Sequence, residues 1–453
     1  MSAARGPGIA NLEPLHRARE QRAWYFYDWA NSAYVTTVQT ALFAPYIIPI
    51  ARRAAVDGRI EAFGLIPIAP GALPAYVITF STILSALLLP PLGAMADRTR
   101  YKKQLLGAFA WIGAAFASLL FFTTGDNWAL GAVAVVGANL ALGASLVVND
   151  SILPLISTEE ERNRVSSRGW ALGYLGGGIL LVLNLGLVLG AEALGITDAF
   201  AARISMLSAA LWWAGFTLVP FLKLRNYEPS HVVPEEGSLV RQSFGQLWAT
   251  MREMRRYPMT LTFLLAYLFF NDGIQTVISQ SSVYIVEELR FESDVLIILI
   301  LTVQFVGFAG ALVFGKAAER HGTKPTILVG LGIWMLIVTA AYFVPDRKLL
   351  PFLVLAVAIG LVLGGTQALA RSYFSLLIPR GREAEYFSFY HAMERGTSWF
   401  GALVFGLVYQ VTGSYRPAIF ALVFFFVVGG ALLLKVDTAR GIREAGNEAP
   451  AVI

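Results

Sequence analysis

Two segments of the chain place carboxylates and amides inside long apolar runs. AWYFYDWANSAY, residues 23–34, holds Asp28 and Asn31 among aromatic residues, and FFNDG pairs Asn271 with Asp272. A charged side chain facing the centre of a bilayer costs about 2.5 to 3.5 kcal/mol even on permissive scales. These side chains must therefore face water or polar partners, where they can bind a polar solute or take up a proton.

The composition places these segments in a membrane protein. The 453 residues are 56% hydrophobic and only 14% charged, with a mean hydropathy of +0.61. Soluble domains carry roughly 25% charged residues, so most of this surface must face lipid. The absence of cysteine excludes disulfides, thiolate metal sites and cysteine nucleophiles. The net charge of +5 does not indicate nucleic-acid binding, because the basic residues lie in short blocks between the apolar runs.

Twelve apolar runs are long enough to cross a bilayer, which takes about 20 residues as a helix. The polar stretch 223–258 divides them into six and six. The sequence therefore predicts an all-α polytopic membrane protein with four parts: an N-terminal six-helix bundle (1–222), a cytoplasmic linker with an amphipathic segment (223–258), a C-terminal six-helix bundle (259–436) and a tail (437–453). The predicted spans are 22–49, 74–95, 104–123, 127–150, 169–190, 203–222, 259–286, 294–315, 325–344, 350–374, 386–411 and 415–434.

The basic residues predict the orientation. Of the 35 Lys and Arg residues, 26 fall in segments on the side of the N-terminus and 8 in loops on the other side. Cytoplasmic segments of membrane proteins carry this excess, so we expect both termini in the cytoplasm. For a bacterial protein, the membrane would be the inner membrane. Residues 1–22 are polar and show no signal-peptide pattern, so the first span is expected to remain as an anchor.

Two loops repeat one motif. GAMADRTRYKK follows the second span, and GKAAERHGTKP follows the eighth. Duplication of a six-helix unit is typical of transporters built from two bundles around a central site. A shift of 222 residues superposes Gly93 on Gly315, Asp97 on Glu319, Arg98 on Arg320 and Lys102 on Lys324.

The paired G-x-x-x-D/E-R loops resemble the signature loop of the major facilitator superfamily. YDWANSAY, FFNDG and GYLGGG together resemble its vacuole-effluxer-like family, whose eukaryotic members are autophagy-related vacuolar amino-acid exporters. The likeness runs from Trp24 to about Leu434 and implies two six-helix bundles related by pseudo-two-fold symmetry. The first loop departs from the superfamily pattern, because Arg100 stands where a glycine is usual and where the second loop has Gly322.

The resemblance implies that spans 1, 4, 7 and 10 line a central cavity. Their amides and acids suit a small polar or zwitterionic solute, although single polar residues in membrane helices also serve as hydrogen-bond partners between helices. In span 11, Arg395 either reaches this cavity or extends to the membrane interface. The expected substrate-binding residues are Asp28, Asn31, Asn139, Asn271, Asp272, Gln275, Gln367 and Arg395.

The resemblance also implies roles for the loops and span ends. In the superfamily, the loop acid reaches the N-terminus of a neighbouring helix, and this contact breaks as the bundles move. The ends of spans 4 and 10 are expected to make contacts between the bundles through Asn149, Asp150 and Arg371 rather than bind the solute. GYLGGG is expected to serve helix packing. The expected gating residues are Gly93, Asp97, Arg98, Gly315, Glu319 and Arg320.

Enzymatic functions find no support in the sequence. GALVFGKA lacks the Ser or Thr of a phosphate-binding loop and lies in a span, and the four histidines are scattered. We expect no catalytic residues, metal or cofactor, and no direct use of ATP. The predicted function is a monomeric secondary transporter of a small polar solute. A transporter-like sensor and an exporter of amphipathic drugs or lipids are the alternatives.

A gradient must then drive transport, and a proton is the expected coupling ion. A carboxylate whose surroundings alternate between apolar and cationic takes up and releases a proton. Asp28 or Asp272 is the expected site. Asp28 is favoured because Trp24, Tyr25 and Trp29 can exclude water. Alternatively, both acids only hydrogen-bond to the solute or to neighbouring helices.

Overall fold

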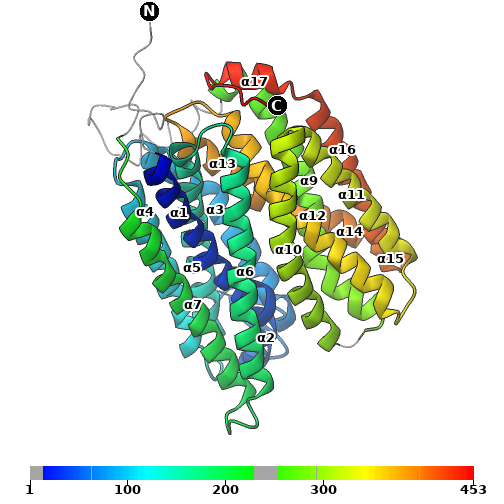
Figure 1. The fold of residues 1–453 in the computed structure, drawn as a ribbon. Helices are drawn as coiled ribbons and strands as arrows, with labels where there is room; N and C mark the ends of the chain where they lie inside the picture. Colours follow the sequence, from blue (N-terminus) through cyan, green and yellow to red (C-terminus); the bar gives the residue numbers. More distant parts are fainter. Residues whose placement is uncertain (1–13, 63, 229–251, 292, 397, 453) are drawn as a thin grey trace, which may run out of the picture.

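The computed structural model describes residues 14–452 except 63, 229–251, 292 and 397. Its helices form two groups that stand side by side, an N-terminal half and a C-terminal half (Figure 1). The N-terminal half contains α1 (Pro14–Tyr34), η2 (Val35–Leu42), α2 (Phe43–Ala54), η3 (Pro70–Ala72), α3 (Leu73–Asp97), α4 (Lys102–Ser118), η4 (Leu119–Phe122), α5 (Trp128–Ile156), α6 (Arg162–Leu189) and α7 (Asp198–Lys223). The C-terminal half contains η5 (Met254–Arg256), α9 (Pro258–Val283), η6 (Tyr284–Glu288), α10 (Ser293–His321), α11 (Thr323–Phe343), α12 (Leu349–Leu376), α13 (Glu383–Gly396), α14 (Ser398–Thr412), α15 (Tyr415–Ala421), α16 (Val423–Lys435) and α17 (Thr438–Glu444).

Within the described residues, eleven helical segments are long and apolar enough to cross a membrane. Ten of the predicted spans correspond to one such segment each, and span 12 corresponds to α15 and α16 taken together as Tyr415–Lys435. Span 11 falls on α13 and α14, and residue 397 between them lies outside the described residues. Most of the predicted linker, 229–251, lies outside the described residues.

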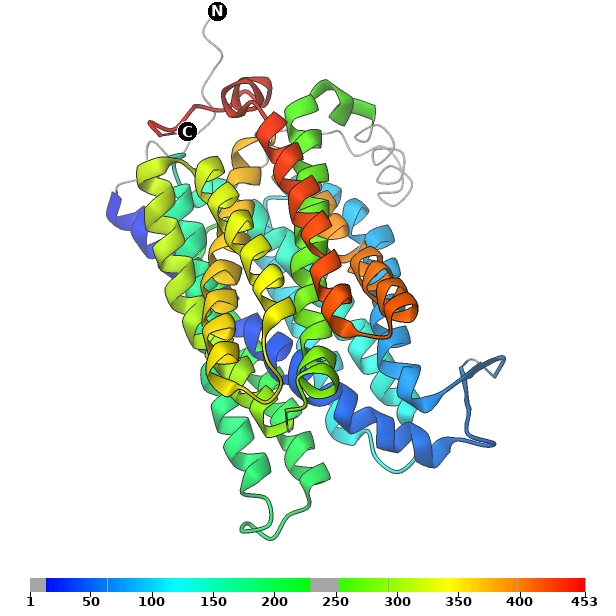
Figure 2. The same cartoon turned by 90° about the vertical axis from the view of Figure 1, so that its right-hand side faces the viewer.

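The first span is longer than predicted. One helical segment extends from Leu15 to Ala54, and its middle, η2, is π-helical. After this helical segment the chain forms a short hairpin of β1 (Ile60–Ala62) and β2 (Ile66–Ile68), which projects from the lower right of the molecule (Figure 2). Single π-helical turns are often found at functional sites.

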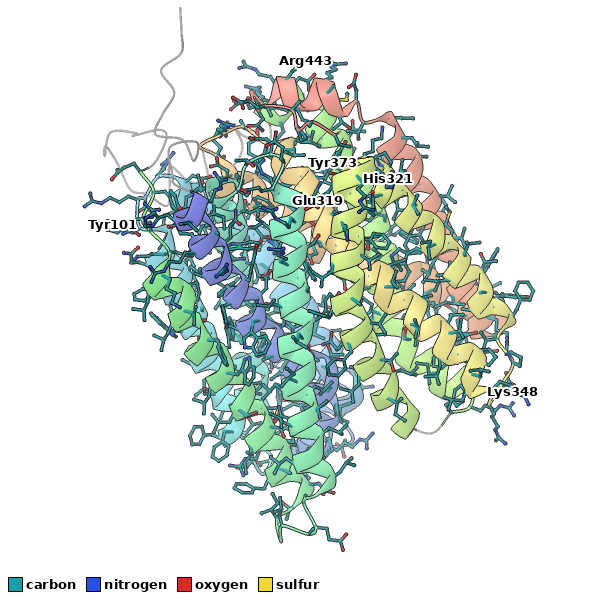
Figure 3. All side chains as sticks on the ribbon, viewed as in Figure 1. Tyr101, Glu319, His321, Lys348, Tyr373 and Arg443 are labelled. Atoms are coloured by element: carbon teal, nitrogen blue, oxygen red, sulfur yellow. The ribbon has the colours of Figure 1, made fainter. Side chains whose placement is uncertain are left out.

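The start of α1 and the C-terminal helix α17 lie at the same end of the molecule (Figure 1). The two signature loops lie at this end too: Tyr101 and His321 mark them in Figure 3, and Lys348 marks the opposite end. We call the end with the loops the motif end. Two loops at the same end, one in each half, agree with the predicted duplication.

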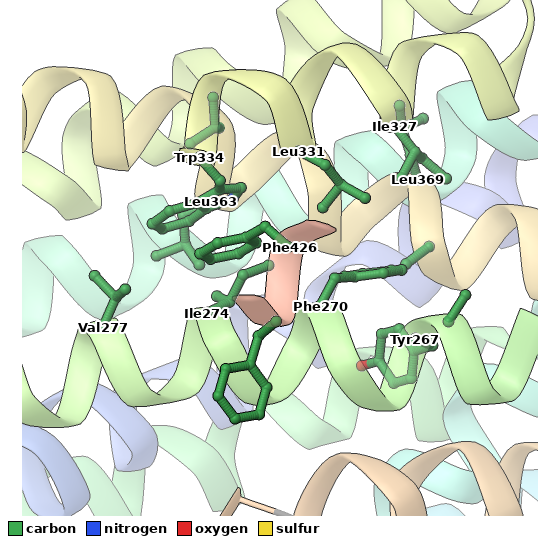
Figure 4. Close-up of a cluster of buried hydrophobic side chains, with 14 of the residues drawn as sticks. Tyr267, Phe270, Ile274, Val277, Ile327, Leu331, Trp334, Leu363, Leu369 and Phe426 are labelled. Atoms are coloured by element: carbon green, nitrogen blue, oxygen red, sulfur yellow. The ribbon is translucent and has the colours of Figure 1, made fainter. Parts of the chain in front are cut away.

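Each half has its own buried core. In the C-terminal half, the rings of Trp334 and Phe426 stack with centroids 5.6 Å apart, beside Tyr267 and Phe270 (Figure 4). Glycines allow close packing elsewhere: a Cβ on Gly176 of the GYLGGG segment would lie 2.8 Å from the Trp29 ring of α1. Small residues have this role between membrane helices because lipid tails provide no hydrophobic drive for association.

The halves meet through two matching contacts at the motif end. Gly93 of α3 lies against the Ala384 carbonyl of α13, and Gly315 of α10 lies against Ser167 of α6. A side chain at either glycine would overlap the facing helix. The signature glycines therefore let α3 approach α13 and let α10 approach α6.

Candidate functional site

Arg371 of α12 lies at the centre of a buried charged cluster between the halves. Its Nη2 lies 3.0 Å from Asp28 Oδ2 of α1, and its Nη1 lies 3.2 Å from Asp150 Oδ1 of α5. Its Nε donates to Ser166 Oγ of α6 at 3.0 Å, and Nη2 also donates to the Ser166 carbonyl at 2.9 Å. One guanidinium thus connects α12 with three helices of the N-terminal half.

Aromatic residues enclose this guanidinium. The Arg371 Cζ lies 4.7 Å from the Trp24 ring centroid and 5.5 Å from that of Trp170. Trp24 is itself fixed, because its Nε1 donates to the Asn149 carbonyl at 2.8 Å. Rings over a desolvated cation stabilise it by about 2 kcal/mol or more. The aromatic wall around Asp28 therefore also holds the arginine that pairs with it.

His391 of α13 extends the cluster. Its Nε2 lies 2.9 Å from Asp150 Oδ2, and its Nδ1 lies 3.0 Å from Glu394 Oε2. The side chains of Asp28, Asp150, Arg371 and His391 are all less than 10% exposed. Asp150 binds Arg371 through one oxygen and His391 through the other, so one carboxylate of the N-terminal half holds a guanidinium and an imidazole of the C-terminal half.

The remaining predicted binding residues lie in separate places. Asn31 donates to the Tyr27 carbonyl of its own helix at 2.7 Å. Asn139 accepts from Tyr34 and Gln39 and donates to Ser81, so its bonds stay within the N-terminal half. The Asn139 contacts match the alternative role stated for single polar residues, as hydrogen-bond partners between helices, whereas the Asn31 bond stays within its own helix.

In the C-terminal half, Gln367 Nε2 donates to Asn271 Oδ1 at 2.8 Å. The adjacent Asp272 points elsewhere: its Oδ2 accepts from the Gly401 backbone nitrogen of α14 at 2.9 Å. Gln275 is half-buried one turn further along α9. The Arg395 side chain lies outside the described residues. The predicted binding residues whose side chains are described therefore form no single cluster; among these, only Asp28 belongs to the charged cluster.

The loop acids behave differently in the two halves. Asp97 accepts from the backbone nitrogens of Ala384 and Glu385, at 3.0 and 2.8 Å, and pairs with Lys102 at 2.8 Å. This is the helix N-terminal contact that the resemblance implies. Glu319, its counterpart, is exposed at the surface (Figure 3). The expectation of two equivalent acids thus does not describe this conformation.

Neutral groups hold the C-terminal loop instead. Asn163 Nδ2 of α6 donates to Thr323 Oγ1 at 2.8 Å, and Asn163 Oδ1 accepts from Ser372 Oγ at 2.6 Å. Further bonds join the halves nearby, with Arg162 donating to the Ser375 carbonyl at 3.1 Å. Hydrogen bonds between the two halves therefore close the motif end around the charged cluster.

His391 is the functional candidate that the sequence did not single out. The sequence patterns assign no role to it. The available signal was the His391–Glu394 spacing of three residues, which places both side chains on one helix face. Nothing in the sequence shows that Asp150, 241 residues away, completes the site.

This arrangement defines a class of protein, and solved structures agree with it. The *Escherichia coli* fucose:proton symporter matches with a TM-score of 0.68 at 14% identity, over 93% of this chain and 98% of that one. The proton:xylose symporter XylE, of the major facilitator superfamily, matches with a TM-score of 0.69 at 10% identity, over 94% and 96%. The predicted fold is confirmed: this is a multi-pass membrane protein with the major facilitator fold.

The family is equally clear. The chain belongs to the family described as "Vacuole effluxer Atg22 like", whose model matches residues 16–446. It is 32% identical over 436 residues to the "Uncharacterized MFS-type transporter YxiO" of *Bacillus subtilis* (strain 168), covering 95% of this chain and 98% of that protein. It is 26% identical over 475 residues to "Autophagy-related protein 22" of *Yarrowia lipolytica*, covering 85% and 79%. The chain is thus a transporter of the major facilitator type.

Proposed function

We propose that this chain is a proton-coupled secondary transporter that moves a small polar solute by alternating access. The observation that carries the proposal is the Arg371 bridge to Asp28 and Asp150, which buries three charged groups between the halves. Removing one partner of a buried ion pair leaves a costly unpaired charge. The three charged groups should therefore pair or separate together. Such a bridge is suited to a protein that switches between a closed and an open conformation.

The distribution of contacts supports alternating access. Bonds between the halves extend from Thr36–Gln304, about midway along their helices, to Asp97 and Glu385 at the motif end. This conformation is accordingly closed at the motif end. With both termini in the cytoplasm, as the basic residues predict, the closed end is the cytoplasmic one.

An amino acid is the solute that suits the charges best. When the bridge opens, Asp28 and Asp150 stay in one half and Arg371 in the other. The ammonium group of a zwitterion can then pair with a carboxylate, and its carboxylate can pair bidentately with the guanidinium. The family description, which names an effluxer, is compatible with export of such a solute.

Asp28 and Asp272 remain the proposed acids for coupling. Asp28 changes surroundings with the bridge, since its partner Arg371 lies in the other half. Asp272 lies inside the C-terminal half, and its Oδ1 has no hydrogen-bond partner among the described residues. Asp28 is the better candidate for the coupling acid, because its partner lies in the other half and moves with it.

Transport by purified protein in proteoliposomes tests the proposal. We expect uptake of radiolabelled amino acids from a panel that includes sugars, with accumulation only when a pH gradient is imposed. The Asp28→Asn variant should lose accumulation and keep exchange, because exchange needs no net proton movement. If no solute in the panel is taken up or exchanged, the proposal is contradicted. Accumulation that does not depend on the pH gradient would contradict the coupling to protons.

A further inference from the structure

His391 is held between two carboxylates in a way that requires a proton. Both ring nitrogens lie within 3.0 Å of carboxylate oxygens, of Asp150 on one side and Glu394 on the other. A neutral imidazole has one N–H and can donate only one of these bonds. Both contacts are hydrogen bonds only when the ring is an imidazolium or when one carboxyl group is protonated. The observed arrangement therefore holds one proton more than neutral histidine with ionised acids.

The charges of the cluster favour this extra proton. Asp28, Asp150 and Glu394 contribute three negative charges, and Arg371 contributes one positive charge. Protonation at His391 places a positive charge between two of these carboxylates, those of Asp150 and Glu394. An opposite charge this close favours the protonated ring, so proton uptake stabilises the assembled contacts.

The other groups packed around α13 do not supply this charge. From α9, Tyr267 stacks on Tyr390, which neighbours His391. Asp97 of α3 binds the first turn of α13, roughly 10 Å of helix rise away from His391. Among the described side chains, Arg371 is thus the cation that shares a partner, Asp150, with His391.

The proton site exists only while the halves are together at the motif end. Asp150 belongs to α5 of the N-terminal half, and His391 and Glu394 belong to α13 of the C-terminal half. Separation breaks the 2.9 Å contact between Asp150 and His391 and leaves the imidazolium with Glu394, which is partly exposed. The proton can then pass from the ring to water on that side.

From this geometry we propose that His391, between Asp150 and Glu394, binds a proton whose uptake closes the motif end and whose release opens it. The inference rests on the proposed transport function and adds to it a proton site distinct from Asp28 and Asp272. It predicts that the closed conformation is favoured at low pH and the open one at high pH.

Distance measurements between spin labels test this directly, and the cysteine-free chain makes labelling simple. We suggest Glu160→Cys and Lys435→Cys, which are exposed at the motif end of the two halves. Raising the pH should increase the ratio of open to closed molecules about fivefold or more, the lower end of ordinary coupling between sites. His391→Gln should make the ratio independent of pH, and His391→Arg, permanently charged, should keep the closed form across the range.

The matched control is His321→Gln, a change at an exposed histidine of the same half. It should titrate like the unsubstituted protein. A His391→Gln variant that titrates normally, or an unsubstituted protein with no pH response, would overturn the inference. His391→Arg provides the second test if His391→Gln does not fold.

Transport by the same proteins separates this inference from the proposed function. If proton-driven accumulation persists unchanged in His391→Gln, the proposed proton site is contradicted and the proposed transport function still stands. A pH response of the label distances that depends on His391, without uptake or exchange of any solute, would support the proton site and sink the transport function.

Discussion

Asp97 Oδ2 lies 2.8 Å from the backbone nitrogen of Glu385, in the first turn of α13. The two residues belong to opposite halves, so a carboxylate of one half caps a helix of the other. The partial positive charge of a helix N-terminus stabilises such an anion. Glu319, at the equivalent position in the repeat, is exposed. The duplicated motif therefore works asymmetrically in this conformation.

This asymmetry predicts unequal effects of two matching substitutions. Asp97→Asn removes the charge at the α13 N-terminus and the ion pair with Lys102, and should shift the equilibrium toward the open motif end by about 1 to 2 kcal/mol. Glu319→Gln should leave it nearly unchanged. The label pair described above measures both. Equal shifts for the two variants would show that the loops act symmetrically.

Glycine 93 offers a steric test of the same interface. A Cβ at Gly93 would overlap the Ala384 carbonyl and lie 2.8 Å from Ser388 Cβ, so Gly93→Ala should force α3 away from α13. Overpacking of this kind typically costs about 1 to 3 kcal/mol, and here it destabilises the closed form. Gly186→Ala is the control, because a Cβ there meets no atom within 4 Å. A closed population unchanged by Gly93→Ala would contradict the predicted fit.

The fold could be predicted from the sequence because few kinds of structure can cross a lipid bilayer. Long apolar runs must be helices, and the loop repeat shows the duplication, so the major facilitator fold followed from these patterns and the resemblance. The π-helical part of span 1 was not predicted. It depends on packing between distant helices, which leaves no period in the sequence.

The site was only partly accessible for the same reason. Asp28 stood out because an acid in an apolar run demands a partner. That the partner is Arg371 depends on how α1 and α12 approach, which hydropathy does not encode. Asn139 and Gln367 were also among the expected binding residues, yet each is engaged inside its own half. Residue type shows that a group needs a partner, whereas tertiary structure decides which one.

Topology yields a prediction that uses the two ends directly. Lys348 and Arg443 are both exposed and lie at opposite ends (Figure 3). If the motif end is cytoplasmic, a membrane-impermeant maleimide should label Lys348→Cys in intact cells and label Arg443→Cys only after permeabilisation. The cysteine-free chain removes background from other sites. The reverse labelling pattern would place the motif end outside.

The Asp28–Arg371 pair allows a test of the cluster itself. Arg371→Gln leaves Asp28 without its cation and leaves Asp150 with His391 as its partner, and breaking a buried pair from one side costs about 3 to 5 kcal/mol. Asp28→Asn should cost less, because Arg371 keeps Asp150 and Ser166. Thermal unfolding of the purified protein measures each loss.

The double variant Asp28→Asn with Arg371→Gln distinguishes a true pair from two independent residues. Once Arg371 is absent, Asp28 is an unpaired buried acid, so its neutralisation should restore part of the stability lost in Arg371→Gln. The losses should therefore be less than additive, as expected for residues in contact. Arg380→Gln is the control, since the Arg380 side chain is 58% exposed and its bond to Glu159 should contribute about 1 kcal/mol or less. Strictly additive losses would mean that Asp28 and Arg371 do not interact in the stable conformation, and the bridge between the halves would have to be assigned to Asp150 alone.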